Sequence, residues 1–283
     1  MDKIIFPIKD ELENFENKLK QVVEDNDNFL TDDLKSFLFN NPKRLRPIFT
    51  FLFSKILKIK NPLVLDIALI TELIHNASLI HDDIIDEEKT RRNHPTFYEK
   101  YGSKIAVLEG DLLLSLALEQ ISKTNQTISQ IFALHIKKTI QGEIKQNENL
   151  NKITDLETYF QKTKDKTANL FFASLECLFN LSDKNQYLYD FLDNFTLAFQ
   201  IKNDLKDLKS DFKNGNYTLP MIYSFMETNK IEIDTTKFIQ KSQIEIQKLK
   251  TKAINHLKNF EDSIYKVSLI KLTNKILEEN KFE

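Results

Sequence analysis

Leu73 to Arg92, LIHNASLIHDDIIDEEKTRR, is the stretch that decides the fold and the chemistry of the chain. It is mostly apolar as far as Ile80, and Asp82, Asp83 and Asp86 then arrive together. Residues three or four apart share one face of an α-helix, so the three carboxylates crowd one side of one turn. That crowding costs helix stability unless a cation neutralises it. Mg²⁺ suits such a site, because it usually binds one or two carboxylates, several waters and a substrate phosphate.

Arginine is rare in this chain and is placed in two short clusters. Of 40 Lys plus Arg, only four are arginine: Arg44, Arg46, Arg91 and Arg92. A planar guanidinium suits bidentate contact with phosphate, which surface solubility does not require. Acidic cluster and arginine pair together indicate a metal-bridged diphosphate. A solvated, charged helix end is the alternative for the acidic cluster taken alone.

The bulk properties set limits on the class of protein. The 283 residues suffice for one large domain or two small ones, and 41% hydrophobic residues can bury a sizeable core. A net charge of −2 gives no general attraction to nucleic acid or anionic membrane. The single Cys177 excludes an internal disulfide and fits a reducing compartment. With no signal peptide and no run of 18 apolar residues, we expect a cytoplasmic protein without stable membrane insertion.

Apolar spacing predicts helices throughout. Four glycines and six prolines are too few for many tight turns, which favours helices over sheets. We expect one all-α domain over residues 1–283, with 91–104 as a loop and 105–122 buried because it is apolar nearly all round. The expected helices cover 8–25, 31–58 with a break at Pro42, 62–88, 105–122, 125–148, 154–180, 186–209, 218–228, 233–257 and 260–281.

A second acidic cluster repeats the spacing of the first. Asp204 and Asp207 are three residues apart, with Gln200 one turn before and Asp211 one turn beyond. Two such helices facing each other would hold metal ions between them. A diphosphate bridging those ions becomes a better leaving group, because metal charge stabilises the developing anion.

Six segments in order across about residues 40–225 resemble one family. They are Lys43-Arg44-Leu45-Arg46-Pro47, His75 with Ser78 to Asp86, Arg91-Arg92, Leu108-Glu109-Gly110-Asp111, Lys166-Thr167-Ala168 and Phe199-Gln200-Ile201. They resemble the GGKRLRP box, the first aspartate-rich motif, its arginine pair, a buried helix, the KTA box and the start of the second aspartate motif. These belong to the trans-isoprenyl diphosphate synthases, or polyprenyl synthetases.

The resemblance implies a fold, an activity and a partner. It implies packed helices around a deep central cavity, usually in a homodimer. It implies Mg²⁺-assisted condensation of isopentenyl diphosphate with an allylic diphosphate, by ionisation, condensation and elimination. The small Ala77 and Ser78, with Gln141-Gly142-Glu143, look more like the longer-chain members, so we expect a product of C20 or longer.

Matching positions also imply roles for individual residues. The implied Mg²⁺ ligands are Asp82, Asp86 and Asp204, with Asp83 and Asp207 supporting. The allylic diphosphate would be held by Arg91, Lys166 and Gln200, with Thr167 nearby. Isopentenyl diphosphate would be held by Lys43, Arg46, His75 and Arg92. The catalytic set is Asp82, Asp86, Lys166 and Asp204.

Departures from the family pattern keep alternatives open. Asn41-Pro42 stands where the family has paired glycines, Asn203 where it has aspartate, and Asn216 where it commonly has lysine. Lys213 could supply the missing cation. The alternatives are a short-chain farnesyl or geranylgeranyl diphosphate synthase, a weakly active or non-catalytic regulatory subunit, and a terpene cyclase. Arg44 could serve packing, a salt bridge or phosphate contact.

Overall fold

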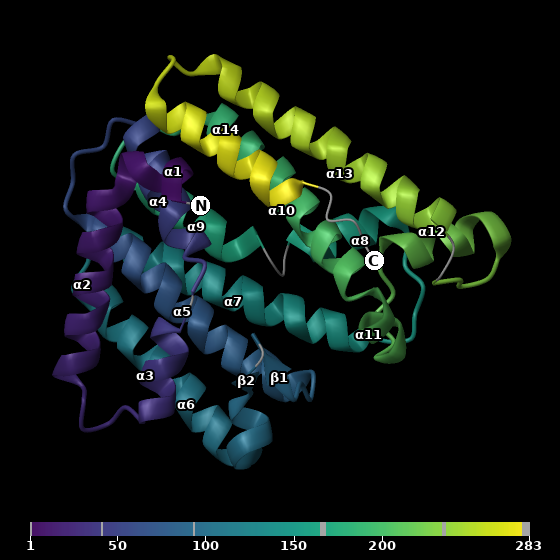
Figure 1. The fold of residues 1–283 in the computed structure, drawn as a ribbon, viewed down its shortest axis with the longest axis horizontal. Coiled ribbons are helices and arrows are strands. Elements are labelled where there is room, and N and C mark those ends of the chain that lie inside the picture. The colour runs from purple at the N-terminus through teal and green to yellow at the C-terminus, as the bar shows by residue number, and fades with distance from the viewer. Residues whose placement is uncertain (1, 41, 93, 165–167, 234–235, 279–283) are drawn as a thin grey trace. The chain divides into compact units, whose positions relative to one another are not determined.

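The computed structural model describes residues 2–40, 42–92, 94–164, 168–233 and 236–278. These residues are almost entirely helical, as expected, and Figure 1 labels most of the elements. The helices are α1 (Asp2–Ile5), α2 (Lys9–Asp25), α3 (Asp32–Phe39), α4 (Leu45–Ile56), α5 (Leu63–Ile85), α6 (Phe97–Ser122), α7 (Gln126–Glu148), α8 (Leu156–Thr163), α9 (Asn169–Asn180), α10 (Gln186–Lys206), α11 (Leu208–Lys213), α12 (Leu219–Thr228), α13 (Thr236–His256) and α14 (Ile264–Leu277), with 3₁₀ turns at Phe6–Ile8 and Leu257–Asn259.

The prediction of a loop over 91–104 is wrong for most of these residues, which lie in a short hairpin and in helix α6. Strands β1 (Thr90–Arg91) and β2 (His94–Pro95) pair antiparallel, Thr90 opposite Pro95. Helix α6 then begins at Phe97, where the Thr96 hydroxyl accepts a hydrogen bond from the Glu99 N–H at 3.1 Å. The helix is interrupted at Gly102, whose φ of 75° favours glycine. A capped first turn therefore precedes the long apolar part.

The chain forms two compact units. The N-terminal unit comprises Ile8–Phe132 with Glu176–Ser182, and the C-terminal unit comprises Met1–Pro7, Ala133–Leu175 and Asp183–Glu283. The first acidic cluster belongs to the N-terminal unit and the second to the C-terminal unit. A single domain over residues 1–283, and a metal site between the two clusters, both stay predictions.

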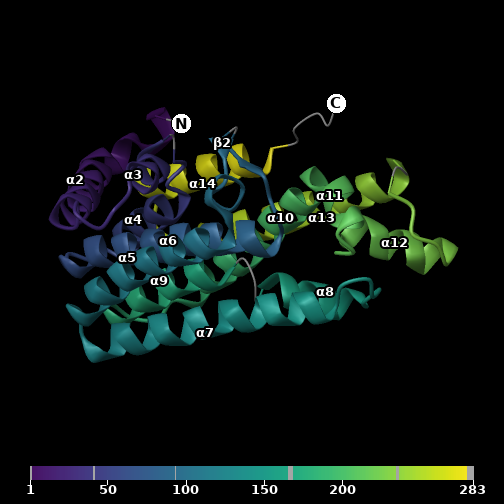
Figure 2. The same cartoon turned by 90° about the horizontal axis from the view of Figure 1, so that it is seen from below.

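Helix α5 is the core helix of the N-terminal unit, where it packs side by side with α6 (Figure 2). It is long and apolar enough to cross a membrane by length and composition, but 67% of its most apolar window is buried inside the protein. It ends at Ile85 rather than at residue 88, because Asp86 leaves the helical region with φ −88° and ψ 0°. Asp86 therefore caps the helix.

The burial predicted for 105–122 is wrong on one face of α6. Ile105, Val107, Leu108 and Leu118 are exposed, Leu108 to 62%. The inner face of α6 packs on α5. The opposite face is also apolar, but it is not covered in one chain. An exposed apolar face of this kind is a candidate interaction surface.

In the C-terminal unit, α10 packs along α13 and also contacts α14 (Figure 1). The described residues of the helix predicted for 154–180 include α8 and α9, and residues 165–167 between them lie outside the described residues. The helix predicted for 186–209 ends at Lys206. The Asp155 side chain caps α8 by accepting from the Thr158 N–H at 2.7 Å. Lys202 Nζ donates to the Ile276 carbonyl near the end of α14 and to the Glu278 carbonyl just beyond it.

Candidate functional site

The first pair of candidate metal ligands lies at the carboxyl end of α5. Asp82 is half-buried, Asp86 is exposed, and the Asp86 N–H donates to the Asp82 carbonyl at 2.9 Å. Among the described residues, no three His, Cys, Asp or Glu side chains converge on one point. Two adjacent carboxylates reachable from solvent fit a hard cation that takes its remaining ligands from water and substrate phosphate.

Asp83 points into the protein and holds Arg91. Its side chain is only 3% exposed, and Arg91 Nε donates to both of its oxygens at 2.8 and 3.0 Å. Burial raises the pKa of Asp83 above its ordinary value, while the Arg91 hydrogen bonds oppose that rise. The predicted role of Asp83 as a supporting metal ligand stays a prediction. The structure shows a second role, which is to position Arg91. Asp83 fixes the guanidinium predicted to hold a diphosphate.

The charges of all four arginines act on the pKa of His75. Burial lowers the pKa of His75 well below its ordinary value, and the charges of Arg46, Arg92, Arg91 and Arg44 lower it further. Burial also lowers the pKa of Arg46 to about 10, with Glu72 and Asp82 opposing. Arg46 therefore stays charged at neutral pH while His75 is neutral. A neutral imidazole among guanidinium groups can donate an N–H to an anion that those groups attract.

His81 packs against α6 rather than into the acidic turn. Its Nε2 lies 3.4 Å from Asp111 Oδ1. A Cβ at Gly110 would come within 2.3 Å of the same nitrogen, so only glycine permits this contact. The Gly110-Asp111 pair thus holds the ring that precedes Asp82, which fixes the end of α5 against α6.

A pocket of about 210 Å³ lies beside the β1–β2 hairpin within the N-terminal unit. Asp83, Arg91 and Arg92 line its polar part. Phe37 and Phe97, whose rings meet edge to face at 5.7 Å between centroids, line an apolar part. Lys43, by contrast, lies exposed in the turn before α4, and Arg46 lies in the first turn of that helix.

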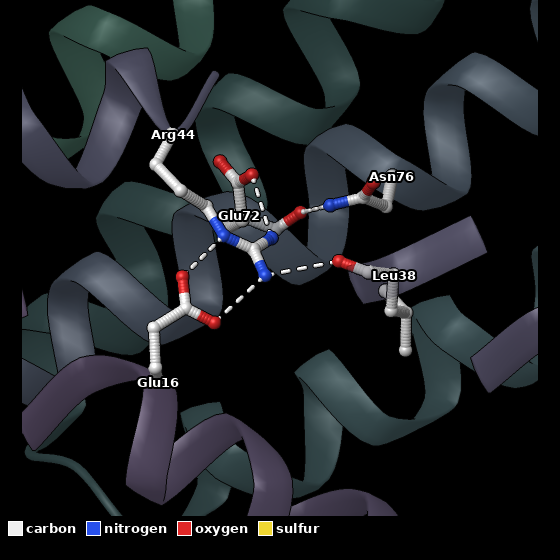
Figure 3. A network of polar contacts seen from close by, with 5 residues as sticks. All are labelled: Glu16, Leu38, Arg44, Glu72 and Asn76. Carbon is white, nitrogen blue, oxygen red and sulfur yellow. Dashed lines mark hydrogen bonds and ion pairs between the residues drawn. The ribbon is translucent and has the colours of Figure 1, made fainter. Parts of the chain in front are cut away.

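Arg44 is a buried structural residue rather than an exposed phosphate ligand. It is 6% exposed, and its guanidinium bonds to Glu16, Glu72 and the Leu38 carbonyl (Figure 3). The salt-bridge hypothesis for Arg44 is therefore the correct one. The sequence alone gave no partner for it, because Glu16 lies 28 residues earlier on another helix.

The second acidic cluster is ordered around Asp204 on α10. Gln200 Nε2 donates to Asp204 Oδ1 at 2.7 Å, and the Tyr159 hydroxyl of α8 donates to Asp204 Oδ2. Burial, with the charge of Asp204, raises the pKa of Tyr159 well above its ordinary value, so the hydroxyl stays a donor. Sequence analysis missed Tyr159. Its signal was a hydroxyl on the helix that leads to the Lys166-Thr167 box.

The side chain of Asn216 is paired with a lysine of α8, Lys162. Lys162 Nζ donates to Asn216 Oδ1 at 2.7 Å, and Asn216 Nδ2 donates to Asp211 Oδ1 at 2.7 Å. The side chain of Lys213, which could have supplied that charge, is exposed. Lys162 is one turn beyond Tyr159, so one face of α8 serves the second acidic cluster.

Three further residues complete the set of predicted positions. Asp207 is exposed and lies in the junction between α10 and α11, with φ −98° and ψ 15°, rather than on the helix of Asp204. Lys166 and Thr167 lie outside the described residues. Their predicted roles at the allylic diphosphate stay predictions.

Comparisons with known proteins identify the family. The polyprenyl synthetase family model matches residues 27–257. A prenyl transferase of Cyanidium caldarium is 31% identical over 278 residues, covering 90% of this chain and 84% of the relative. Heptaprenyl diphosphate synthase component 2 of Bacillus subtilis is 30% identical over 234 residues, covering 77% of this chain and 67% of the relative.

A solved structure shows the same fold. Polyprenyl synthase from Caulobacter crescentus CB15, complexed with calcium and isoprenyl diphosphate, superposes with a TM-score of 0.85 at 21% identity, covering 98% of this chain and 97% of that one. The chain belongs to the polyprenyl synthetase family. It is a prenyl transferase with the all-α isoprenoid synthase fold.

Proposed function

We propose that this chain condenses isopentenyl diphosphate with an allylic diphosphate, with Mg²⁺, to give a polyprenyl diphosphate of C20 or longer. The carbon–oxygen bond of the allylic substrate breaks, a carbon–carbon bond forms to isopentenyl diphosphate, and one proton leaves the product. Inorganic diphosphate is the other product. The sequence motifs and the family support this transfer, in which two diphosphates must be held together.

One observation carries the proposal: on the helix that ends in the acidic cluster, the pKa of His75 is lowered by its burial and by the charges of all four arginines of a lysine-rich chain. A protein that needs only surface charge uses lysine for it, as this chain does elsewhere. Arg46, Arg91 and Arg92 are partly or fully exposed, and guanidinium groups near a neutral imidazole suit an anion with several oxygens at fixed angles. A terpene cyclase, which handles one diphosphate, has no need of this second set of cations.

Each proposed role follows from the position that the residue matches in the family's motifs, and it suits the chemistry of the side chain. Arg46, His75 and Arg92, with Lys43, hold isopentenyl diphosphate, while Arg91, fixed by Asp83, holds the allylic diphosphate with Gln200, Lys166 and Thr167. Asp82, Asp86 and Asp204, supported by Asp83 and Asp207, would hold Mg²⁺. When bound, Mg²⁺ supplies positive charge that stabilises the departing diphosphate.

The proposed product length follows from α5. Ala77 is small and buried, and it lies five residues before Asp82 on α5. Ile74 is also buried and lies three residues before Ala77. Phe132, also buried in the N-terminal unit, is a candidate end of the product tunnel. Relatives that make heptaprenyl diphosphate support a long product.

We also propose that the protein is a homodimer that acts in the cytoplasm. The exposed apolar face of α6 supports an association between copies of the chain. One relative is named component 2 of a heptaprenyl diphosphate synthase. The alternative partner is therefore a second, different chain. The sole cysteine, Cys177, is buried, which agrees with a reducing compartment.

A transfer assay tests the function. The purified chain, Mg²⁺, labelled isopentenyl diphosphate and an allylic primer should give labelled lipid-soluble products. Omitting the primer or chelating the metal should abolish them, and Asp82→Ala should reduce turnover by orders of magnitude with helical content unchanged. Absence of labelled product from the purified chain, while a second chain restores it, would instead support the regulatory-subunit alternative.

A further inference from the structure

The residue that the proposed mechanism leaves unused is Arg44, at the centre of a polar network in the N-terminal unit. Its Nε and Nη2 donate to the two carboxylate oxygens of Glu16 at 2.7 and 3.0 Å. Its Nη1 donates to Glu72 Oε1 at 3.1 Å, and Nη2 also donates to the Leu38 carbonyl at 2.9 Å. Figure 3 shows the guanidinium between the two carboxylates. One cation therefore joins α2, the end of α3 and α5.

Glu72 is the unusual partner in this network. Its side chain is 5% exposed, and its Oε2 makes no hydrogen bond within the described residues. The Asn76 side chain bonds to the backbone carbonyl of Glu72, at 2.7 Å, and not to its carboxylate. A buried carboxylate with one oxygen unmatched attracts any cation within reach.

The charge of Glu72 also acts on two of the cations proposed for isopentenyl diphosphate, Arg46 and Arg92. Glu72 precedes His75 by one turn of α5. Its charge raises the pKa of Arg46 and that of Arg92, against the burial that lowers both. Glu72 therefore competes with a bound diphosphate for the same two guanidinium groups. Arg44 is the cation that donates a hydrogen bond to Glu72, through Glu72 Oε1.

The backbone conformation of Arg44 also indicates a structural role for its side chain. Its φ of 49° and ψ of 33° are left-handed, a conformation that costs free energy for a residue with a Cβ. Arg44 is the N-cap of α4, directly after Lys43 and two residues before Arg46. Its side-chain network holds this turn, and the turn sets the direction of both neighbouring cations.

We propose that Arg44 is a positioning residue of the isopentenyl diphosphate site: it neutralises Glu72 and fixes the turn, so that Arg46 and Arg92 remain with the substrate. The inference rests on the proposed function, because it assigns those two arginines to that substrate. Arg44 itself does not touch the diphosphate.

Paired substitutions test the competition. Arg44→Gln should raise the KM for isopentenyl diphosphate about tenfold or more, with kcat and the allylic KM changed less than about threefold. Adding Glu72→Gln, which removes the competing charge, should bring that KM back to within about threefold of the wild-type value. Calorimetric binding of isopentenyl diphosphate without a primer measures the same effect without turnover.

Controls separate positioning from stability. Lys18→Gln breaks another ion pair between α2 and α5, with Asp66, and should leave the KM unchanged. If Arg44→Gln does not fold, Arg44→Lys with and without Glu72→Gln replaces it, since lysine keeps the charge but loses the fork.

The outcomes are distinct. Equal affinity for isopentenyl diphosphate in wild type and in both Arg44 variants, or no recovery on adding Glu72→Gln, overturns the inference. If the wild type itself does not bind isopentenyl diphosphate, the proposed function fails instead.

Discussion

His75 illustrates what burial does to a single residue at this site. The imidazole is neutral at neutral pH because burial and four guanidinium groups disfavour its charged form. Neutrality has a use here: the ring can donate to phosphate without adding a further positive charge to a crowded cluster. Asp83 shows the complementary case, a buried carboxylate whose position is stabilised by the arginine it holds.

The lowered pKa of His75 predicts a pH dependence of stability. In the unfolded chain histidine takes up a proton near pH 6.5, whereas the native ring does not. The unfolded state then binds more protons, so the free energy of unfolding falls as the pH drops through that value. His75→Gln removes this term. Urea titrations from pH 7.5 to 5.5 should show the wild type losing stability relative to the variant, and parallel curves would contradict the assignment.

At the scale of elements, α8 and α10 are joined through Asp204. The Tyr159 hydroxyl donates to a buried carboxylate, a bond of a kind worth about 1.5–3 kcal/mol. Tyr159→Phe should lower the free energy of unfolding by roughly that amount and raise the Mg²⁺ concentration needed for half-maximal turnover. Tyr187→Phe, on an exposed face of α10, is the matched control and should change neither. An unchanged Mg²⁺ requirement would remove Tyr159 from the site.

Helix α5 is also where product length can be tested. Ala77→Phe should shift products towards C15, because the ring would occupy the proposed tunnel rather than the acidic turn. Ala77→Ser keeps the site small and should leave lengths unchanged. Chromatography of dephosphorylated products gives the comparison, with urea titration to measure the overpacking cost of about 1–3 kcal/mol. Unchanged lengths in the Phe variant would show that this wall does not set the product.

Much of this arrangement could be predicted from local pattern, and the remainder depends on contacts between distant residues. Helices α2, α7 and α12 follow from apolar spacing, and the two acidic clusters follow from i, i+3 and i+4 spacing. The end of α5 at Ile85 and the break at Asp207 could not be predicted, because both depend on backbone angles that charged sequence permits but does not dictate. Arg44, Tyr159 and Lys162 have partners on other helices, so no local spacing indicates their roles.

At the scale of the whole molecule, the uncovered face of α6 is the proposed interface between copies of the chain. If copies associate through it, Leu108→Lys with Leu118→Lys should halve the mass measured by light scattering, since two charges would be buried in an apolar interface. Phe29→Lys makes the same chemical change at a residue that is 73% exposed outside α6, and should leave the mass unchanged. A dimer that persists in the double variant would place the interface elsewhere. A monomeric wild type would exclude the homodimer.

The central claim is that this chain alone elongates an allylic diphosphate. The most direct measurement is mass spectrometry of the dephosphorylated products formed by the purified chain from isopentenyl diphosphate, an allylic primer and Mg²⁺. We expect a metal-dependent series of products, each longer by one isoprene unit, that reaches C20 or beyond. A series that stops at C15 would contradict the product assignment, and the absence of any elongated product from active, folded protein would contradict the claim itself.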